Sequence, residues 1–302
     1  MTTLYTHQES NIARTWVLMA VFFAVVVCVG WALSYWYQSP EILWIALVVS
    51  LFMNVWSYWF SDKVALAVSR ARPASREEFF DLYTVTENLA ITAGLPRPAL
   101  YVINDPAPNA FATGRDKEHA AVAVTSGLLQ RLDRTELEGV IAHELSHIGN
   151  RDILLSSVVV VLVGFLSLIA DFFLRGALFG GGRNNDSKAG GILAIVGLVL
   201  IILSPIIATL IQLAISRRRE FLADASGALL SRYPEGLASA LEKIAAHPAP
   251  LRSAHQATAH LFISNPFGPK SARGLSRLFM THPPVEERIR ALRGEAASHE
   301  NA

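Results

Sequence analysis

The sequence predicts a mainly α-helical membrane protein, with four transmembrane helices and a split α+β domain that contains a small β-sheet. Of its 302 residues, 52% are hydrophobic and only 17% are charged, whereas soluble domains average about 25% charged residues. The apolar residues concentrate in four runs, at residues 16–37, 42–60, 153–174 and 191–215. Each run has about the 20 residues that a helix needs to cross a bilayer.

These runs divide the chain into four parts. Residues 1–60 are expected to form an N-terminal transmembrane hairpin, and residues 153–215 a second one. Polar segments at residues 61–152 and 216–302 flank the second hairpin and together are long enough to bury a core. We therefore expect them to fold as one domain that is interrupted by the second hairpin.

The distribution of aromatic and basic residues supports the membrane assignment. All six tryptophans lie in the first 60 residues, most of them near the ends of the first two runs, as is typical of the aromatic belts at membrane interfaces. Basic residues follow the second run at 63–76 and the fourth at 217–219. The positive-inside rule therefore places both termini and the polar segments in the cytoplasm. The three basic residues between 175 and 188 disagree with this orientation.

Charge and cysteine content exclude several classes of function. Lys and Arg number 26 and Asp and Glu number 25, so no net positive field is available to bind nucleic acid. The single cysteine, Cys28, excludes an intrachain disulfide and a cysteine-rich zinc site. A transporter is disfavoured because Asp171 is the only acid in the four runs. Arg175 follows it at i+4, which favours an interfacial ion pair over a proton relay.

The first polar segment predicts a helix followed by a small sheet. Apolar residues recur at helical spacing over residues 76–93, and Gly94 ends the pattern. Short β-prone runs follow at residues 99–103, 109–114 and 120–124. We expect these three runs to be strands.

A histidine pair in the same segment points to metal chemistry. His143, Glu144 and His147 form the pattern H-E-x-x-H on an amphipathic helix, for which Thr135 and Glu138 predict a capping box. Histidines at i and i+4 share one helix face and can bind one Zn²⁺. The glutamate lies beside that face, where it can take a proton from the attacking water. The alternative is a histidine pair on the protein surface that binds no metal.

A catalytic zinc needs a third protein ligand and an open position. Without a usable cysteine, the third ligand must be His, Glu or Asp, and Glu220 is the best candidate because its helix continues the fourth apolar run. The H-E-x-x-H helix is expected to continue almost without a break into the third run. Asp224 lies at i+4 from Glu220 and can accept the free N–H of a ligating imidazole. The alternative is that Glu220 and its neighbours are simply the exposed, charged start of a helix.

At these residues the chain resembles the HtpX family of integral-membrane zinc metalloproteases, which is related to the CAAX prenyl proteases. The resemblance covers roughly residues 10–292. Its motifs are NAFATG at 109–114, HELSH at 143–147, RREFLAD at 218–224, ATAHLF at 257–262 and THPP at 281–284. It implies a zincin-like catalytic domain with one zinc ion, held by His143, His147 and Glu220, and with Glu144 as general base.

The resemblance also implies roles outside the ligand set. Asn109 and the strand that follows it, with Ala110 and Phe111, would hold the substrate backbone as an added β-strand. His282 could donate to the developing oxyanion or simply precede the last helix, expected at residues 283–293. His260 is expected to be structural.

The implied function is a multi-pass endopeptidase of a bacterial inner membrane with its active site facing the cytoplasm. Its substrates would be misfolded or damaged membrane proteins or unfolded polypeptides, and its task quality control and stress response. One alternative is a CAAX-type endopeptidase for prenylated proteins. Another is a non-proteolytic membrane scaffold with a relic metal site. The sequence gives no oligomeric state.

Overall fold

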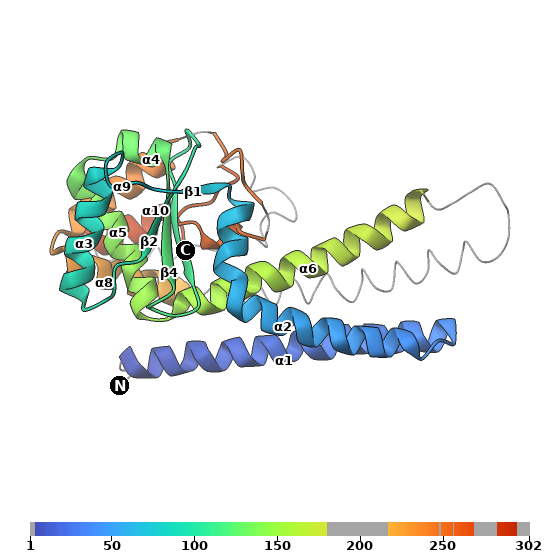
Figure 1. Cartoon of the computed structure of the whole chain (residues 1–302). Coiled ribbons are helices and arrows are strands. Elements are labelled where there is room, and N and C mark those ends of the chain that lie inside the picture. The colour runs from blue at the N-terminus through green and yellow to red at the C-terminus, as the bar shows by residue number, and fades with distance from the viewer. Residues whose placement is uncertain (1–3, 180–216, 248, 256, 269–282, 295–302) are drawn as a thin grey trace, which may run out of the picture.

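Long apolar helices project from a body in which helices surround a four-stranded sheet (Figure 1). The computed structural model describes residues 4–179, 217–247, 249–255, 257–268 and 283–294. The fourth apolar run, at residues 191–215, and His282 lie outside the described residues.

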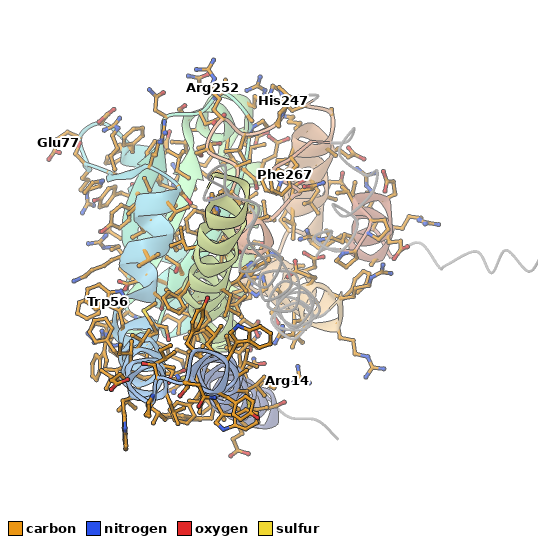
Figure 2. All side chains as sticks on the ribbon, turned by 90° about the vertical axis from the view of Figure 1, so that its right-hand side faces the viewer. Arg14, Trp56, Glu77, His247, Arg252 and Phe267 are labelled. Atoms are coloured by element: carbon orange, nitrogen blue, oxygen red, sulfur yellow. The ribbon has the colours of Figure 1, made fainter. Side chains whose placement is uncertain are left out.

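Helices α1 (Leu4–Tyr37) and α2 (Glu41–Val68) form the predicted N-terminal hairpin and lie side by side (Figure 1). Within the described ranges, they are the two helices that are long and apolar enough to cross a membrane unaided. Their large apolar side chains remain exposed, Trp44 by 68% and Trp56 by 39%. Figure 2 shows Trp56 at the edge of this helix pair. Such side chains are suited to contact lipid.

Helix α6 (Asp152–Phe179) contains the third apolar run and packs against both helices of the hairpin. Leu18 and Phe22 of α1 meet Leu155 and Val159 of α6 in one apolar cluster. The part of α6 from Asp152 to Leu168, taken together with α5 (Arg134–Gly149), is also long and apolar enough to be a candidate span.

The prediction that the H-E-x-x-H helix continues into the third run is wrong in its geometry. An angle of 84° separates α5 from α6. Between them Arg151 has a φ of 59°, in the left-handed region that a regular helix cannot contain. The chain therefore turns sharply just after His147.

The sheet has the strand order β1-β2-β4-β3. Strand β2 is parallel to β4, whereas β1 pairs with β2 and β3 pairs with β4 in antiparallel fashion. The three predicted strands are confirmed, and β1 was missed because it has only three residues, one of them proline. The strands are β1 (Ala71–Pro73), β2 (Ala99–Ile103), β3 (Ala110–Gly114) and β4 (Ala120–Thr125).

The two faces of the sheet belong to different apolar clusters, because successive side chains of a strand point to opposite faces. One face packs against α3 (Phe80–Ala93), α5 and α9 (Pro234–Ala245). The other packs against the end of α2, α6 and part of the segment 251–262. Helix α3 begins four residues later than predicted and ends at Gly94 as predicted, with a φ of 64°.

The remaining described elements are short and complete the body. The last helix begins at Val285, two residues later than predicted. These elements are α4 (Ser126–Arg131), α8 (Arg217–Ser231), the 3₁₀ turn η1 (Ala259–Leu261) and α10 (Val285–Leu292).

Candidate metal centre

Helix α5 begins with a capping box two residues before the predicted one. The Asp133 carboxylate accepts the N–H of Glu136 at 2.9 Å, and the Glu136 carboxylate accepts the N–H of Asp133 at 2.8 Å. The predicted pair Thr135 and Glu138 does not cap the helix, since the Thr135 hydroxyl donates to Asp133 instead. A carboxylate is a stronger acceptor than a hydroxyl. This cap fixes the start of the helix that carries the histidines.

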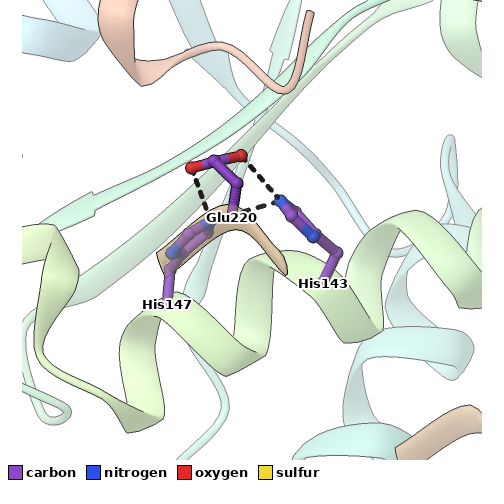
Figure 3. A group of neighbouring side chains, drawn as sticks. All are labelled: His143, His147 and Glu220. Carbon is purple, nitrogen blue, oxygen red and sulfur yellow. Dashed lines mark hydrogen bonds and ion pairs between the residues drawn. The ribbon is translucent and has the colours of Figure 1, made fainter. Parts of the chain in front are cut away.

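Three predicted ligands meet on α5 and α8 (Figure 3). Nε2 of His143 lies 3.2 Å from Nε2 of His147. The Glu220 carboxylate oxygens lie 3.9 Å from the first of these nitrogens and 3.7 Å from the second. Two nitrogens on a tetrahedral zinc, at about 2.0–2.1 Å from the ion, are roughly 3.3 Å apart. The spacing of the three groups therefore fits one small cation.

The close approach of α8 to α5 depends on a glycine. A Cβ atom at Gly227 would lie 2.9 Å from the backbone nitrogen of His143 and 3.1 Å from its Cα. Only a residue without a side chain allows the two helix backbones to lie at this distance. Gly227 therefore helps to bring Glu220 to the histidines, and its role was not predicted from the sequence.

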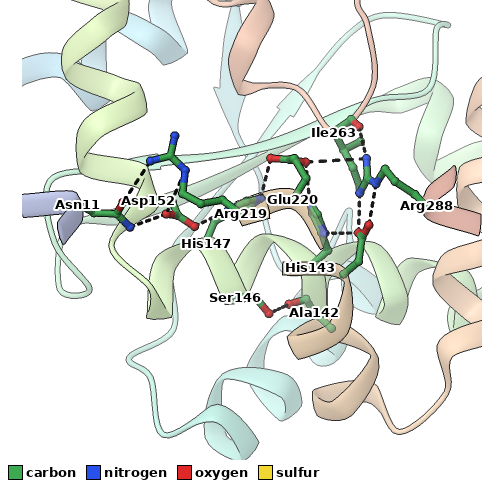
Figure 4. Close-up of polar contacts among 11 residues, drawn as sticks. Asn11, Ala142, His143, Ser146, His147, Asp152, Arg219, Glu220, Ile263 and Arg288 are labelled. Carbon is green, nitrogen blue, oxygen red and sulfur yellow. Dashed lines mark hydrogen bonds and ion pairs between the residues drawn. The ribbon is translucent and has the colours of Figure 1, made fainter. Parts of the chain in front are cut away.

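A carboxylate faces the second nitrogen of each imidazole (Figure 4). Asp224 Oδ1 lies 2.9 Å from Nδ1 of His143, where the sequence predicts it. Asp152 Oδ2 lies 2.9 Å from Nδ1 of His147. Such partners fix the tautomer and the orientation of metal-ligating histidines. Asp152 was not predicted, although an acid five residues after the second histidine of the motif was a usable signal.

The two histidines differ in their electrostatic surroundings. Burial lowers the pKa of His143 to about 4, although Asp224 acts in the opposite direction. Burial also acts to lower the pKa of His147, but the hydrogen bond to Asp152 and the charge of Glu220 outweigh it and raise the pKa to about 9. A cation that binds both rings displaces the proton of His147.

A buried arginine lies next to this cluster. Arg288 of α10 is fully buried and donates from Nε and Nη2 to the two carboxylate oxygens of Asp224, at 2.8 and 2.7 Å. Its Nη1 donates to the Ile263 backbone oxygen at 2.9 Å and lies 3.9 Å from Glu220. The sequence analysis missed Arg288. The signal was its position in the apolar stripe formed by Val285, Ile289 and Leu292.

Glu144 lies beside the ligand cluster, as predicted. Burial raises the pKa of its carboxyl group to about 7, and the backbone N–H of Ala112 donates to it. Glu144 lines a cavity of about 30 Å³ together with His147, Glu220 and His260. A cavity of this size holds a water molecule and is too small for an amino-acid side chain of a substrate. The His260 Nε2 atom bonds to the Ser156 backbone oxygen at 2.9 Å, and its structural role stays a prediction.

The three predicted substrate-binding residues lie on or next to β3 and are buried. The Asn109 amide bonds to the backbone of Ser264, and the backbone oxygen of Ala110 accepts the N–H of Ile263 at 2.9 Å. Phe111 packs edge-to-face against the ring of Phe262. Asn109 borders a separate cavity of about 610 Å³ that none of the ligand side chains lines. This end of β3 is thus already paired with the segment at 263–264.

A family model and individual relatives of known description agree on the family to which the chain is similar. The sequence model of "Peptidase family M48" matches residues 76–296. A "Protease HtpX homolog" of Syntrophobacter fumaroxidans is 50% identical, over 93% of this chain and 98% of the relative. Relatives with the same description from Caldanaerobacter subterraneus and Pyrococcus furiosus are 46% and 49% identical. The alignments cover 96% and 93% of this chain, and 97% and 94% of those relatives.

The crystal structure of S. mikatae Ste24p aligns with a TM-score of 0.49 and 16% sequence identity, over 95% of this chain and 67% of that chain.

Proposed function

The chain belongs to peptidase family M48, and on that premise we propose that it is a membrane endopeptidase whose metal is zinc. The observation that carries this proposal is the cluster of His143, His147 and Glu220, whose ligand atoms all lie within 4.8 Å of one another. Two imidazoles and one carboxylate are ligands that zinc favours.

The three ligand side chains would hold zinc from two helices. His143 and His147 would bind through Nε2, because a carboxylate faces Nδ1 of each ring. Zinc bound there would polarise the scissile carbonyl of a peptide and acidify the attacking water. Glu220 would supply the carboxylate ligand, and Arg288 near it limits the accumulation of negative charge.

Glu144 is the proposed general base. Glu144 lines the small cavity together with His147 and Glu220, and the attacking water would occupy that cavity. Burial raises the pKa of the Glu144 carboxyl group and a bound cation would lower it, and a carboxylate at this place could accept a proton from the water and then donate it to the leaving amine. No covalent intermediate with the chain is required, so reagents against serine or cysteine nucleophiles should have no effect.

Substrate is proposed to add to the outer edge of β3. Ala110 at one end of that edge already pairs with Ile263. Ala112 is two residues further along the same edge and lines the cavity that contains Glu144. The substrate backbone would therefore extend past Ala112, and the wall formed by His260 and Leu261 would have to move to admit it.

The proposed topology has four membrane spans and a catalytic domain split between residues 61–152 and 216–302. Helices α1 and α2 would form the first hairpin and residues 153–215 the second. The location would be the bacterial inner membrane with the active site in the cytoplasm, as the basic residues near the span ends indicate. The proposed substrates are misfolded or damaged membrane proteins.

The function is tested by casein hydrolysis with the full chain in detergent, comparing the wild type with Glu144→Gln. General-base catalysis contributes about 10²–10⁴ in rate, so the variant should lose at least about a hundredfold in activity. It should keep its zinc, because Glu144 is not one of the three ligands. Glu138→Gln, on the outer side of the same helix, is the matched control and should retain activity.

Each other outcome has a definite meaning. Full activity in Glu144→Gln would refute the role of that residue as base. Cleavage of a prenylated peptide, but not of casein, would favour the CAAX-type alternative. A purified protein that contains no zinc and hydrolyses neither substrate would favour the non-proteolytic membrane scaffold.

A further inference from the structure

A buried amide near the start of α1 is connected to the metal centre. Asn11 is only 4% exposed and lies on the helix that contains the first candidate span. Its Nδ2 donates to the Asn150 backbone oxygen at 3.1 Å and to Asp152 Oδ1 at 2.6 Å. Its Oδ1 accepts a hydrogen bond from Nη1 of Arg219 at 3.1 Å (Figure 4). The NH₂ group and the oxygen of this amide are therefore both hydrogen-bonded to residues around the candidate metal centre.

These contacts reach both metal-binding helices. Asp152 uses Oδ1 for Asn11 and Oδ2 for Nδ1 of His147. Arg219, whose Nε lies 3.8 Å from the same Oδ1, immediately precedes Glu220. The Asn11 amide thus contacts Asp152, which faces His147, and Arg219, which immediately precedes Glu220.

Burial of such an amide needs a physical reason. An amide that is removed from water costs free energy unless its donors and acceptor are bonded, and an apolar residue would fill the space without that cost. Carboxylates behind metal-ligating histidines are themselves held by hydrogen bonds, and the loss of such outer partners typically lowers metal affinity 10–100-fold. The geometry of Asn11 matches this task, since it holds the carboxylate oxygen that His147 does not use.

We propose that Asn11 is a positioning residue of the metal centre, through which α1 holds Asp152 and thereby His147. The inference rests on the proposed function, because it takes His147 to be a metal ligand. It makes zinc affinity depend on a residue 141 positions away from Asp152 in the sequence, on the first membrane helix.

The test is the zinc affinity of the full chain in detergent, measured by competition with a chromophoric chelator. Asn11→Ala should bind zinc about 10–100-fold more weakly than the wild type. It should also lower kcat for casein and leave KM unchanged, because Asn11 is buried and does not line the cavity that contains the candidate site of the attacking water. The matched control is Thr15→Val, one turn along α1. Thr15 is equally buried, and its hydroxyl donates to the Asn11 backbone oxygen at 2.9 Å.

Exchanging the side chains of Asn11 and Asp152 tests whether Asn11 acts by its hydrogen bond to Asp152 or only by filling space. Asn11→Asp alone places two carboxylates side by side and should weaken zinc binding. Adding Asp152→Asn restores one hydrogen bond between an amide and a carboxylate, and it leaves an amide oxygen available to Nδ1 of His147. The hydrogen bond to the Asn150 backbone oxygen stays lost, because a carboxylate at position 11 cannot donate. The double variant should therefore bind zinc more tightly than Asn11→Asp and more weakly than the wild type.

The inference is overturned if Asn11→Ala binds zinc as tightly as Thr15→Val, or if the exchange recovers nothing. A wild-type protein that binds no zinc would overturn the proposed function as well. The two failures are therefore distinguishable in one set of titrations.

Discussion

Arg288 places one positive charge between two acidic side chains of the metal centre. It bonds to both oxygens of Asp224 and approaches Glu220. Burial acts to lower the pKa of this guanidinium, but the two carboxylates outweigh burial and raise it. With Arg288 in place, the pKa of Asp224 falls to about 2 even though burial acts to raise it. Asp224 thus remains an anion behind His143.

Replacing Arg288 with leucine should destabilise the protein strongly. Removal of one partner of a buried ion pair leaves an uncompensated charge, which costs about 3–5 kcal/mol. The change is measured by chemical denaturation of the metal-free chain in detergent. Arg290→Leu is the matched control, because Arg290 is exposed on the same helix. Equal stabilities for the two variants would contradict this account of Arg288.

At the scale of elements, the site is the contact between α5 and α8. Each helix supplies part of the candidate ligand set. Gly227 lets their backbones approach closely, at the level of His143. The distance between these two helices therefore controls the distance between Glu220 and the histidines.

Gly227→Ala should weaken zinc binding without changing any ligand. A methyl group at this position would meet backbone atoms of α5, which cannot move aside as a flexible side chain can. Overpacking of this kind costs about 1–3 kcal/mol, and the resulting shift of α8 should lower zinc affinity at least about tenfold, as the loss of an outer-shell partner does. Gly164→Ala is the control, because its added carbon would lie 3.9 Å from Ala257, an ordinary contact. Unchanged zinc affinity in Gly227→Ala would contradict the prediction.

Local patterns predicted some elements and not others. The hairpin of α1 and α2, the strands at 99–103 and 120–124 and the helix with His143 were recognisable because period and composition are local properties. The bend after α5 was not, since it depends on the left-handed conformation of a single arginine, Arg151. The capping box was misplaced by two residues because two candidate pairs have the same spacing.

At the scale of the whole molecule, the candidate centre joins segments that are far apart in the sequence. Its polar contacts extend from α1 through α5 and α6 to α8 and α10. The sequence indicated the candidate ligands, because H-E-x-x-H and the motif at 218–224 carry them. Asp152 and Arg288 left local signals that were missed, in the spacing after His147 and in the apolar stripe of the last helix. Asn11 left none, because its partners lie 139 to 208 positions away and are set by tertiary packing.

Zinc should consequently stabilise the whole fold. A ligand that binds only the folded state adds about 2.7 kcal/mol when its concentration is about 100 times its Kd. Thermal unfolding of the metal-free chain in detergent, with and without zinc, measures this effect. Glu220→Ala should lose most of the increase in Tm. An equal increase in this variant would place the zinc elsewhere on the protein.

The most direct test of the central claim, that one zinc ion at this cluster carries the hydrolysis, is a titration of the metal-free wild type with zinc while casein cleavage is recorded. The account predicts no activity without metal and a linear rise that ends at one zinc per chain, with Glu144→Gln binding the same amount and cleaving at least about a hundredfold more slowly. Cleavage by the metal-free protein, or a rise that continues well beyond one equivalent, would contradict it.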